Sequence, residues 1–379
     1  MVIARNSLFG LSFQELSAIA EQLGQPSYRA RQIYEGMYVQ RRQSLDEITN
    51  LPRDFRKVLE EQGFSIDLPK IQKQFTSSDG TIRYLLELAD GESVETVWMP
   101  EGDGGEAGDG SEAGAAESPQ MPSTAGWKQQ GRFHRATICI SSQVGCAVDC
   151  HFCMTALLGL KRNLSVGEIV GQVATVLNER GVTLEKERIN LVFMGQGEPF
   201  LNYDNFMKAV RLLADAEGVG IPASRMTVST SGIVPRIYDF GKEEIRPKLA
   251  ISLNASNDES RLQLMPITKK WDLEKLMTAA REFPLRNRER LTFEYVLLEN
   301  VNDAEQNARE VAELLRGLRA KVNLIALNPG PEIPFSMPQE TRVLAFQRTL
   351  VEAGIPAYIR RPRGRDIYAA CGQLKRTDA

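Results

Sequence analysis

The sequence predicts an α/β protein in which six βα units form the core, preceded by a small helical module and a short β extension. Three observations support this prediction. From residue 135 onward, apolar stretches of strand length alternate with helical stretches, which indicates a parallel sheet. Residues 1–65 have the pattern of helices. Between these two regions, Asp-Gly turns separate short strand-like stretches, which is typical of an antiparallel meander.

The N-terminal module, residues 1 to about 65, contains three candidate helices. The first, LSAIAEQLG, follows a predicted capping box of Ser12 and Glu15 and ends at Gly24. The second is SYRARQIYEGMYVQRR, and the third is LPRDFRKVLEEQG, which stops at Gly63. Because the charges of the module nearly balance, a packing role and an RNA-docking role are equally compatible with it.

The β extension, residues 66–134, places TIRYLLELA between the turn dipeptides Asp79-Gly80 and Asp90-Gly91. The segment 101–131 within it is rich in Gly, Ala, Ser and acidic residues and has no Val, Ile or Leu, so we expect a disordered surface insertion. It carries six acidic residues and one basic residue, or −5, so the rest of the chain is −3 − (−5) = +2. A net charge of this size outside the segment is too small to indicate a nucleic-acid partner.

The core, residues 135–345, contains six candidate strands, at 136–142, 189–195, 226–232, 248–254, 291–298 and 321–327. A capping box of Ser165 and Glu168 precedes one intervening helix, and Asp303 is the predicted N-cap of the helix at 303–315. The units could close partly as a barrel or stay open and doubly wound. In both cases the ligand site lies at the C-terminal ends of the strands. Residues 346–379 form a separate C-terminal segment.

The composition is that of an ordinary globular protein, with 25% charged and 42% apolar residues. The first residues lack the features of a secretory signal, and no apolar run approaches the roughly 18 residues of a membrane span. We therefore expect a cytoplasmic protein that does not engage a membrane. Three of the five cysteines fall within eight residues, which disfavours a disulfide framework and favours a metal site.

These clustered thiols, Cys146, Cys150 and Cys153, form a Cys-x3-Cys-x2-Cys motif directly after the first core strand. Three thiolates can ligate three irons of a 4Fe–4S cluster and leave the fourth iron open. The alternative is a zinc site with Cys139 or His151 as the fourth ligand. Zinc sites usually pair two short knuckles far apart in the sequence, and no second knuckle exists here, so the motif favours the cluster.

The two remaining cysteines, Cys139 and Cys371, are isolated, and an isolated cysteine is most often a small buried apolar residue. Cys371 fits that interpretation poorly because it lies beside Gly372 in a short basic tail. Arginines at such positions would lower the pKa of a nearby thiol and attract phosphate, although a solvated surface is an equally good interpretation of them. These arginines are Arg360, Arg361, Arg363 and Arg365.

The cysteine motif on the first βα loop resembles the signature of the radical S-adenosylmethionine (SAM) superfamily. Phe152, between the last two cysteines, also matches. Gly197-Glu198-Pro199 resembles the GEP motif that holds the methionine ammonium, although alone it would indicate only a turn before a helix. The resemblance implies a partial (βα)6 barrel and a 4Fe–4S cluster. It also implies that SAM chelates the open iron and is cleaved reductively to a 5′-deoxyadenosyl radical.

Longer motifs in order along the chain resemble the RlmN/Cfr family of RNA adenosine methyltransferases. They are TICISSQVGCAVDCHFC, MGQGEP, VSTSGIVPRI, AISLNASND and RGRDIYAACGQL, and the match excludes only the 101–131 insertion. The resemblance implies methylation of carbon 2 of adenosine in 23S rRNA and in tRNA. A Cfr-type enzyme acting on carbon 8 is the alternative within the family; the fuller helical module favours the RlmN type. A non-catalytic iron–sulfur protein that binds RNA or senses redox state is the alternative from another class.

The resemblance also assigns roles to residues. Cys371 takes a methyl group from a first SAM, a radical formed on that methyl with a second SAM adds to the adenine, and Glu95 accepts the ring proton. Cys139 then attacks the sulfur of Cys371, which releases the RNA and leaves a disulfide for a thiol reductant. The implied partners are 23S rRNA, tRNA and an electron donor such as flavodoxin or ferredoxin, with the protein acting as a monomer.

The cofactor contacts implied by the resemblance lie at strand ends, and one departs from the family pattern. The family usually has His where this chain has Asn254, which can form hydrogen bonds but cannot carry charge. The implied contacts are Gly197, Glu198, Ser229, Ser252, Leu253, Asn254 and Asn328.

Overall fold

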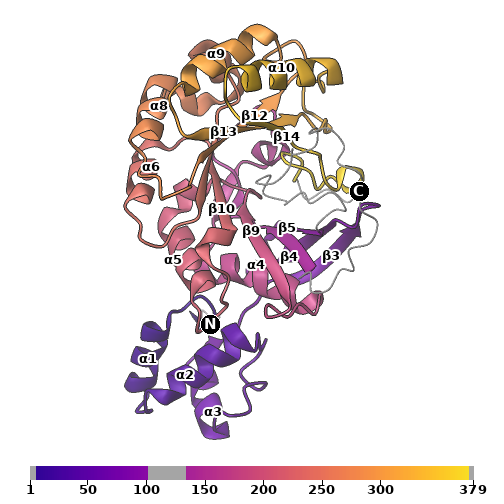
Figure 1. Ribbon diagram of the computed structural model, residues 1–379. Helices are drawn as coiled ribbons and strands as arrows, with labels where there is room; N and C mark the ends of the chain where they lie inside the picture. Colours follow the sequence, from indigo (N-terminus) through magenta and orange to yellow (C-terminus); the bar gives the residue numbers. More distant parts are fainter. Residues whose placement is uncertain (1–5, 101–133, 375–379) are drawn as a thin grey trace, which may run out of the picture.

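The computed structural model describes residues 6–100 and 134–374, so the expected insertion at 101–131 lies outside the described residues (Figure 1). The six expected core strands are all present, and each is parallel to the core strands beside it. They are β6 (His134–Cys139), β9 (Glu187–Phe193), β10 (Met226–Thr230), β11 (Lys248–Ser252), β12 (Leu291–Leu297) and β13 (Ala320–Ala326).

A further strand, β14 (Ala357–Ile359), pairs parallel to β13 and was not predicted from the sequence. With only three residues it carries too little alternation to be recognised. The strand order of the main sheet begins at one edge with β14 and continues through β13, β12, β11, β10 and β9 to β6. The sheet does not close on itself, so the described βα units form an open, partial barrel.

The predicted meander is confirmed, and it extends the same sheet beyond β6. Its strands are β3 (Lys70–Thr76), β4 (Ile82–Glu87) and β5 (Ser93–Pro100), and β5 pairs antiparallel with β6. The β extension and the barrel therefore share one sheet of ten described strands. This continuity brings β4 and β5 close to the C-terminal end of β6, where the candidate site lies.

Helices cover the outer face of the barrel, as Figure 1 shows for α5, α6, α8, α9 and α10. The barrel helices are α4 (Val166–Glu179), α5 (Tyr203–Ala214), α6 (Val234–Gly241), α7 (Asp258–Leu264), α8 (Leu273–Glu282), α9 (Glu305–Leu315) and α10 (Glu340–Glu352). Short 3-10 turns are η2 (Met154–Leu158), η3 (Pro199–Asn202), η4 (Ala223–Arg225), η5 (Pro266–Lys269) and η6 (Arg365–Ile367). No described helix has the length and apolar character needed to cross a bilayer.

Two predicted helix starts within the barrel can be compared with the structure. The capping box of Ser165 and Glu168 is confirmed at the start of α4. The N-cap predicted at Asp303 is wrong, because α9 begins at Glu305 with Ala304 as its N-cap. The buried Asp303 carboxylate instead accepts from the backbone N of Asn300 at 3.0 Å and pairs with Arg342 of α10 at 2.8 Å.

The N-terminal module lies at one end of the barrel and consists of α1 (Phe13–Gln22), α2 (Tyr28–Tyr34) and α3 (Arg53–Glu61) (Figure 1). The capping box of Ser12 and Glu15 is confirmed. The second predicted helix changes to a π-helical turn, η1 (Glu35–Val39), after α2. Two short parallel strands, β1 (Asn6–Ser7) and β2 (Phe64–Ser65), join the ends of the module.

Candidate active site

The cysteine motif occupies a loop closed at its base by the hairpin of β7 (Gln143–Gly145) and β8 (Leu160–Asn163). Gly145 has φ +80°, and a Cβ atom there would lie 1.7 Å from the carbonyl oxygen of Gly159, so only glycine fits. The backbone N of Cys146 donates to that same oxygen at 3.1 Å. The loop therefore holds its cysteines in a tight arc.

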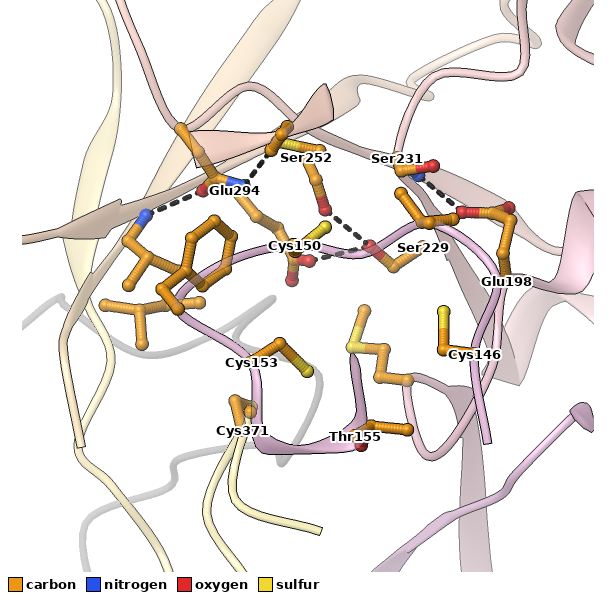
Figure 2. A pocket seen from close by; sticks show the side chains of 18 of the residues that line it. Cys146, Cys150, Cys153, Thr155, Glu198, Ser229, Ser231, Ser252, Glu294 and Cys371 are labelled. Atoms are coloured by element: carbon orange, nitrogen blue, oxygen red, sulfur yellow. Dashed lines mark hydrogen bonds between the residues drawn. The ribbon is translucent and has the colours of Figure 1, made fainter. Parts of the chain in front are cut away.

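Cys146, Cys150 and Cys153 all line one cavity, which we call the first cavity (Figure 2). Burial raises the pKa of all three thiols, and of Cys146 to about 12; the charge of Cys153 adds to the effect at Cys146 and Cys150. Three buried thiolates that line one cavity are stable only against a strong cationic partner. Among the described residues no three side chains converge on a single metal ion, and three thiols in this motif fit a larger 4Fe–4S cluster with one open iron. Neither candidate fourth ligand for zinc lines this cavity, since Cys139 lies elsewhere and His151 is exposed.

Other walls of the first cavity come from the C-terminal ends of the barrel strands, as the βα pattern predicts. Six of the seven predicted cofactor residues line it. The exception is Leu253, which is fully buried in the apolar core and whose backbone N donates to the carbonyl of Glu294 at 2.9 Å. The six that line the cavity are Gly197, Glu198, Ser229, Ser252, Asn254 and Asn328.

Glu198 presents a fixed carboxylate to this cavity. It accepts from the backbone N of Ser231 at 2.7 Å, from Phe200 N at 3.0 Å and from the Thr230 hydroxyl at 2.8 Å. Burial raises the pKa of Glu198, and these hydrogen bonds oppose the shift. A carboxylate held in this way suits a cationic ligand group such as an ammonium.

Glu294, on β12, is a cavity residue that the sequence analysis missed. Its carboxylate accepts from the Ser229 hydroxyl at 2.7 Å, and that hydroxyl lies 3.4 Å from the hydroxyl of Ser252 (Figure 2). The sequence feature that could have identified Glu294 is that it is the single charged residue in the largely apolar predicted strand LTFEYVLL. A lone carboxylate in a buried strand needs a polar partner, and here it is Ser229 on β10, two strands away in the sheet.

Asn254 adopts a left-handed conformation, with φ +56°, which Asn tolerates better than most residues. Its side-chain oxygen accepts from the backbone N of Val296 at 2.8 Å, and its amide nitrogen lies 3.2 Å from the sulfur of Met265. Asn254 therefore ties the end of β11 to β12 at the cavity wall, using hydrogen bonds alone.

Cys371 lies in the C-terminal tail at the junction of two cavities. The second cavity, as we call it, also contains Cys139, the last residue of β6. Two hydrogen bonds hold the tail around Cys371 against the end of the cluster loop: Met154 N to Gly372 O (2.7 Å) and the Thr155 hydroxyl to Leu374 O (2.7 Å). A third, from the Gln373 amide to Pro329 O (3.0 Å), joins the tail to the segment that follows β13.

All five cysteines of the chain are free thiols, so the predicted disulfide between Cys139 and Cys371 is absent from this structure. Each of the two thiols is held by a different element, one by the sheet and the other by the tail. Burial and then the charge of Cys371 raise the pKa of Cys139, and desolvation raises that of Cys371. Both shifts favour the protonated thiol over the thiolate.

Glu95 lies outside both cavities. Its side chain, on β5, is 1% exposed and forms a 2.6 Å ion pair with the fully buried Arg83. It also accepts from the amide of Gln196 at 3.2 Å. The predicted proton acceptor therefore lies outside the two cavities, although its partner Gln196 directly precedes the predicted cofactor residue Gly197.

Three cysteines from the first βα loop, facing a cavity at the ends of a partial barrel, define a radical SAM protein. The model for the Radical SAM superfamily matches residues 140–312, and the model for the Ribosomal RNA large subunit methyltransferase N-terminal domain matches residues 6–64. A solved structure described as a radical SAM methyltransferase from Sphaerobacter thermophilus is 40% identical, with a TM-score of 0.84; the match covers 97% of this chain and 99% of that one.

Two relatives define the family more narrowly. The chain is 70% identical over 358 residues to a Koribacter versatilis (strain Ellin345) protein named probable dual-specificity RNA methyltransferase RlmN, covering 94% of this chain and 98% of that protein. It is 42% identical over 361 residues to the Syntrophobacter fumaroxidans (strain DSM 10017 / MPOB) dual-specificity RNA methyltransferase RlmN, covering 95% of each. The chain therefore belongs to the RlmN family.

Proposed function

We propose that this protein methylates carbon 2 of adenosine in 23S rRNA and in tRNA. The observation that supports the proposal most directly is the position of Cys371, where the cavity lined by the three cluster thiols meets the cavity that contains Cys139. A residue that carries a methyl group from SAM to a nucleotide would have to lie at such a junction. The names of the relatives, and the match of residues 6–64, favour this assignment over methylation of carbon 8.

The first cavity is the proposed site of the 4Fe–4S cluster and of SAM, with Cys146, Cys150 and Cys153 as the cluster ligands. When bound, this cluster supplies the electron for reductive cleavage of SAM to a 5′-deoxyadenosyl radical. Glu198 is proposed to hold the methionine ammonium of SAM, because its carboxylate is fixed by the three hydrogen bonds described above. Ser229, Ser252, Asn254 and Asn328 supply further polar groups along the same wall.

Cys371 is the proposed methyl carrier, since the C–H at carbon 2 is not acidic and cannot be methylated directly by a sulfonium. In the first step its thiol loses a proton and its sulfur takes the methyl of one SAM. Loss of a hydrogen atom from that methyl, with a second SAM, gives a carbon radical that adds to the adenine ring. Protein and RNA are then covalently joined through Cys371.

Cys139 is proposed to release the product by attacking the sulfur of Cys371, which forms a transient disulfide that an external thiol reduces. The adduct must lose the ring proton and one electron before the base is released. Removal of the ring proton is assigned to Glu95 by the family resemblance, and the electron would return to the cluster that was oxidised when SAM was cleaved. In this role Glu95 would have to leave its ion pair with Arg83, because it lines neither cavity here. The proposed electron donor is a flavodoxin or ferredoxin, and the proposed form is a cytoplasmic monomer.

The test is nucleoside mass spectrometry on RNA treated anaerobically with reconstituted protein, reductant and SAM that carries a trideuterated methyl. Label at carbon 2 of adenosine with two deuteriums retained is the expected result, because one deuterium leaves with the deoxyadenosyl group. Label at carbon 8 would indicate a Cfr-type enzyme instead. If deoxyadenosine forms but the RNA is not modified, the protein carries out radical SAM chemistry and the proposed RNA substrate is wrong. If neither product forms, the result favours a non-catalytic iron–sulfur protein.

A further inference from the structure

The two cavities differ in charge, although they meet at Cys371. The first cavity is lined by two carboxylates, Glu198 and Glu294, and by no Lys or Arg among the described residues. The second cavity is lined by three arginines and by no carboxylate among the described residues. The first therefore suits the cationic groups of SAM, and the second suits an anion. The arginines are Arg360, Arg361 and Arg363.

The remaining lining of the second cavity is largely apolar. Much of it comes from the ends of neighbouring strands and from the tail. Its cationic part is the arginine edge, which we define as Arg360, Arg361 and Arg363, and the proposed cluster ligand Cys153 lines both cavities. An apolar pocket bordered by guanidinium groups matches a single nucleotide, whose base needs apolar or stacking walls and whose phosphates need cationic partners. The apolar residues include Met99, Val192, Met194, Ile325 and Leu374.

The arginine edge is anchored at both of its ends. At the first end, β14 pairs with β13, and the backbone N of Arg360 donates to Leu324 O at 2.8 Å, where the sheet ends beside the cavity. At the other end, Gly364 turns the chain with φ +60°, and its N donates to the Asp79 carboxylate at 3.0 Å. Residues 360–363 therefore form a short bridge along the cavity rather than a loose tail.

We propose that Arg360, Arg361 and Arg363 bind the phosphates flanking the target adenosine, while the second cavity takes up its base next to Cys371. The inference rests on the proposed function, and it names the surface that holds the RNA. RNA bases are usually reached in single-stranded loops or by extrusion from the stack, and both leave the flanking phosphates at the mouth of the pocket. Guanidinium groups bind such phosphates in a bidentate manner.

The test compares variants in an RNA-binding titration at several KCl concentrations, with a fluorescent RNA hairpin that has one adenosine in its loop as the probe. Removing one arginine that binds a phosphate should reduce the slope of log affinity against log salt by about 0.7–0.9. We expect R361Q/R363Q to reduce it by about 1.5 and to weaken binding at least about tenfold. R363K should keep the slope, because it keeps the charge.

The matched control is R365Q, which removes an arginine of the same basic run. Arg365 does not line the second cavity, and its guanidinium lies 3.6 Å from the sulfur of Met337. R365Q should therefore bind the hairpin with the wild-type slope. Circular dichroism and bound iron would show that each variant folds, and R361Q alone provides a second test should R361Q/R363Q not fold.

A wild-type slope in R361Q/R363Q, or in R361Q alone, would overturn the proposal. An equal reduction of the slope in R365Q would overturn it too, because bulk charge rather than the cavity edge would then bind RNA. If wild-type protein still methylates RNA at carbon 2 while the slopes are unchanged, only this inference fails. If wild-type protein neither binds nor methylates RNA, the proposed function fails with it.

Discussion

Cys139 and Cys371 share the second cavity, but each is held by a different part of the fold. In the proposed cycle, Cys371 carries the RNA and Cys139 cleaves that link. We therefore expect C139A to accumulate a covalent protein–RNA adduct, detected as a band that survives denaturing electrophoresis. C371A is the control; it should form neither adduct nor methylated RNA, yet retain its iron. Free methylated RNA released by C139A at the wild-type rate would contradict the resolving role.

Glu95 forms a buried ion pair with Arg83, whose guanidinium also lies 4.2 Å from the centre of the Phe75 ring. Removing one partner of a buried pair leaves the other charge poorly compensated, which costs about 3–5 kcal/mol. We expect E95Q to lower the free energy of unfolding by about 3 kcal/mol, measured by urea titration.

The exposed Glu87 on the adjacent strand provides the control for this substitution, and E87Q should change the stability by less than about 0.5 kcal/mol. A double variant, R83M/E95L, should recover part of the lost stability because no charge is left buried. Unchanged stability of E95Q together with lost methylation would instead support Glu95 as the proton acceptor.

At the scale of elements, the C-terminal tail packs on the turn between β3 and β4. The Asp366 carboxylate accepts from the Ser77 hydroxyl at 2.5 Å and from Ser78 N at 3.1 Å, while Asp79 accepts from Gly364 N. The hydrogen bond from Ser77 holds the pKa of Asp366 below its usual value. These contacts position the segment that leads to Cys371.

D366N should loosen this tail at neutral pH, seen as faster hydrogen exchange of amides 364–373. A carboxylate whose pKa is depressed by folding stabilises the fold above its unfolded pKa, and this contribution is lost as the pH falls through the folded value. The difference between D366N and wild type should therefore begin to shrink as the pH falls below about 4, the ordinary pKa of an aspartate, and should vanish below the lower folded pKa. D46N, in the N-terminal module, is the control. Equal exchange in D366N and wild type at pH 7 would show that Asp366 does not hold the tail.

At the scale of the whole molecule, the N-terminal module is joined to the barrel by a close backbone contact. Gly10 has φ +102°, and a Cβ atom there would lie 2.4 Å from the backbone N of Gly167 in α4. A second contact is the hydrogen bond from the Tyr34 hydroxyl to Asp215, after α5. The orientation of the module therefore depends on glycine at both positions of the backbone contact.

G10A should disturb this docking and lower the free energy of unfolding by about 3 kcal/mol, through backbone strain and the steric clash together. G24A is the matched control, because Gly24 also has positive φ (+67°) but no atom within 4 Å of the added Cβ. G24A should lower the free energy of unfolding by about 1 kcal/mol. Urea titration measures both. Equal losses of stability in the two variants would show that α4 shifts to accommodate the added methyl group.

The local elements of this protein could be predicted from its sequence, because they depend on neighbouring residues. The strands at the Asp79-Gly80 turn, the capping boxes at Ser12 and Ser165, and the six core strands follow from periodicity and turn chemistry. The three cluster cysteines share one cavity because eight consecutive residues contain them all. The family could be recognised because its long motifs occur in order along the chain.

Only the tertiary structure decided which distant residues meet. Cys139 and Cys371 lie 232 positions apart, yet they share a cavity because β14 and Gly364 return the tail to the end of β6. Contacts between strands place Glu294 in the first cavity and hold Glu95 outside both cavities, in an ion pair with Arg83. The sequence by itself determined the chemical groups and the local elements, whereas the division of charge between the two cavities required packing, because packing sets which side chains face the same space.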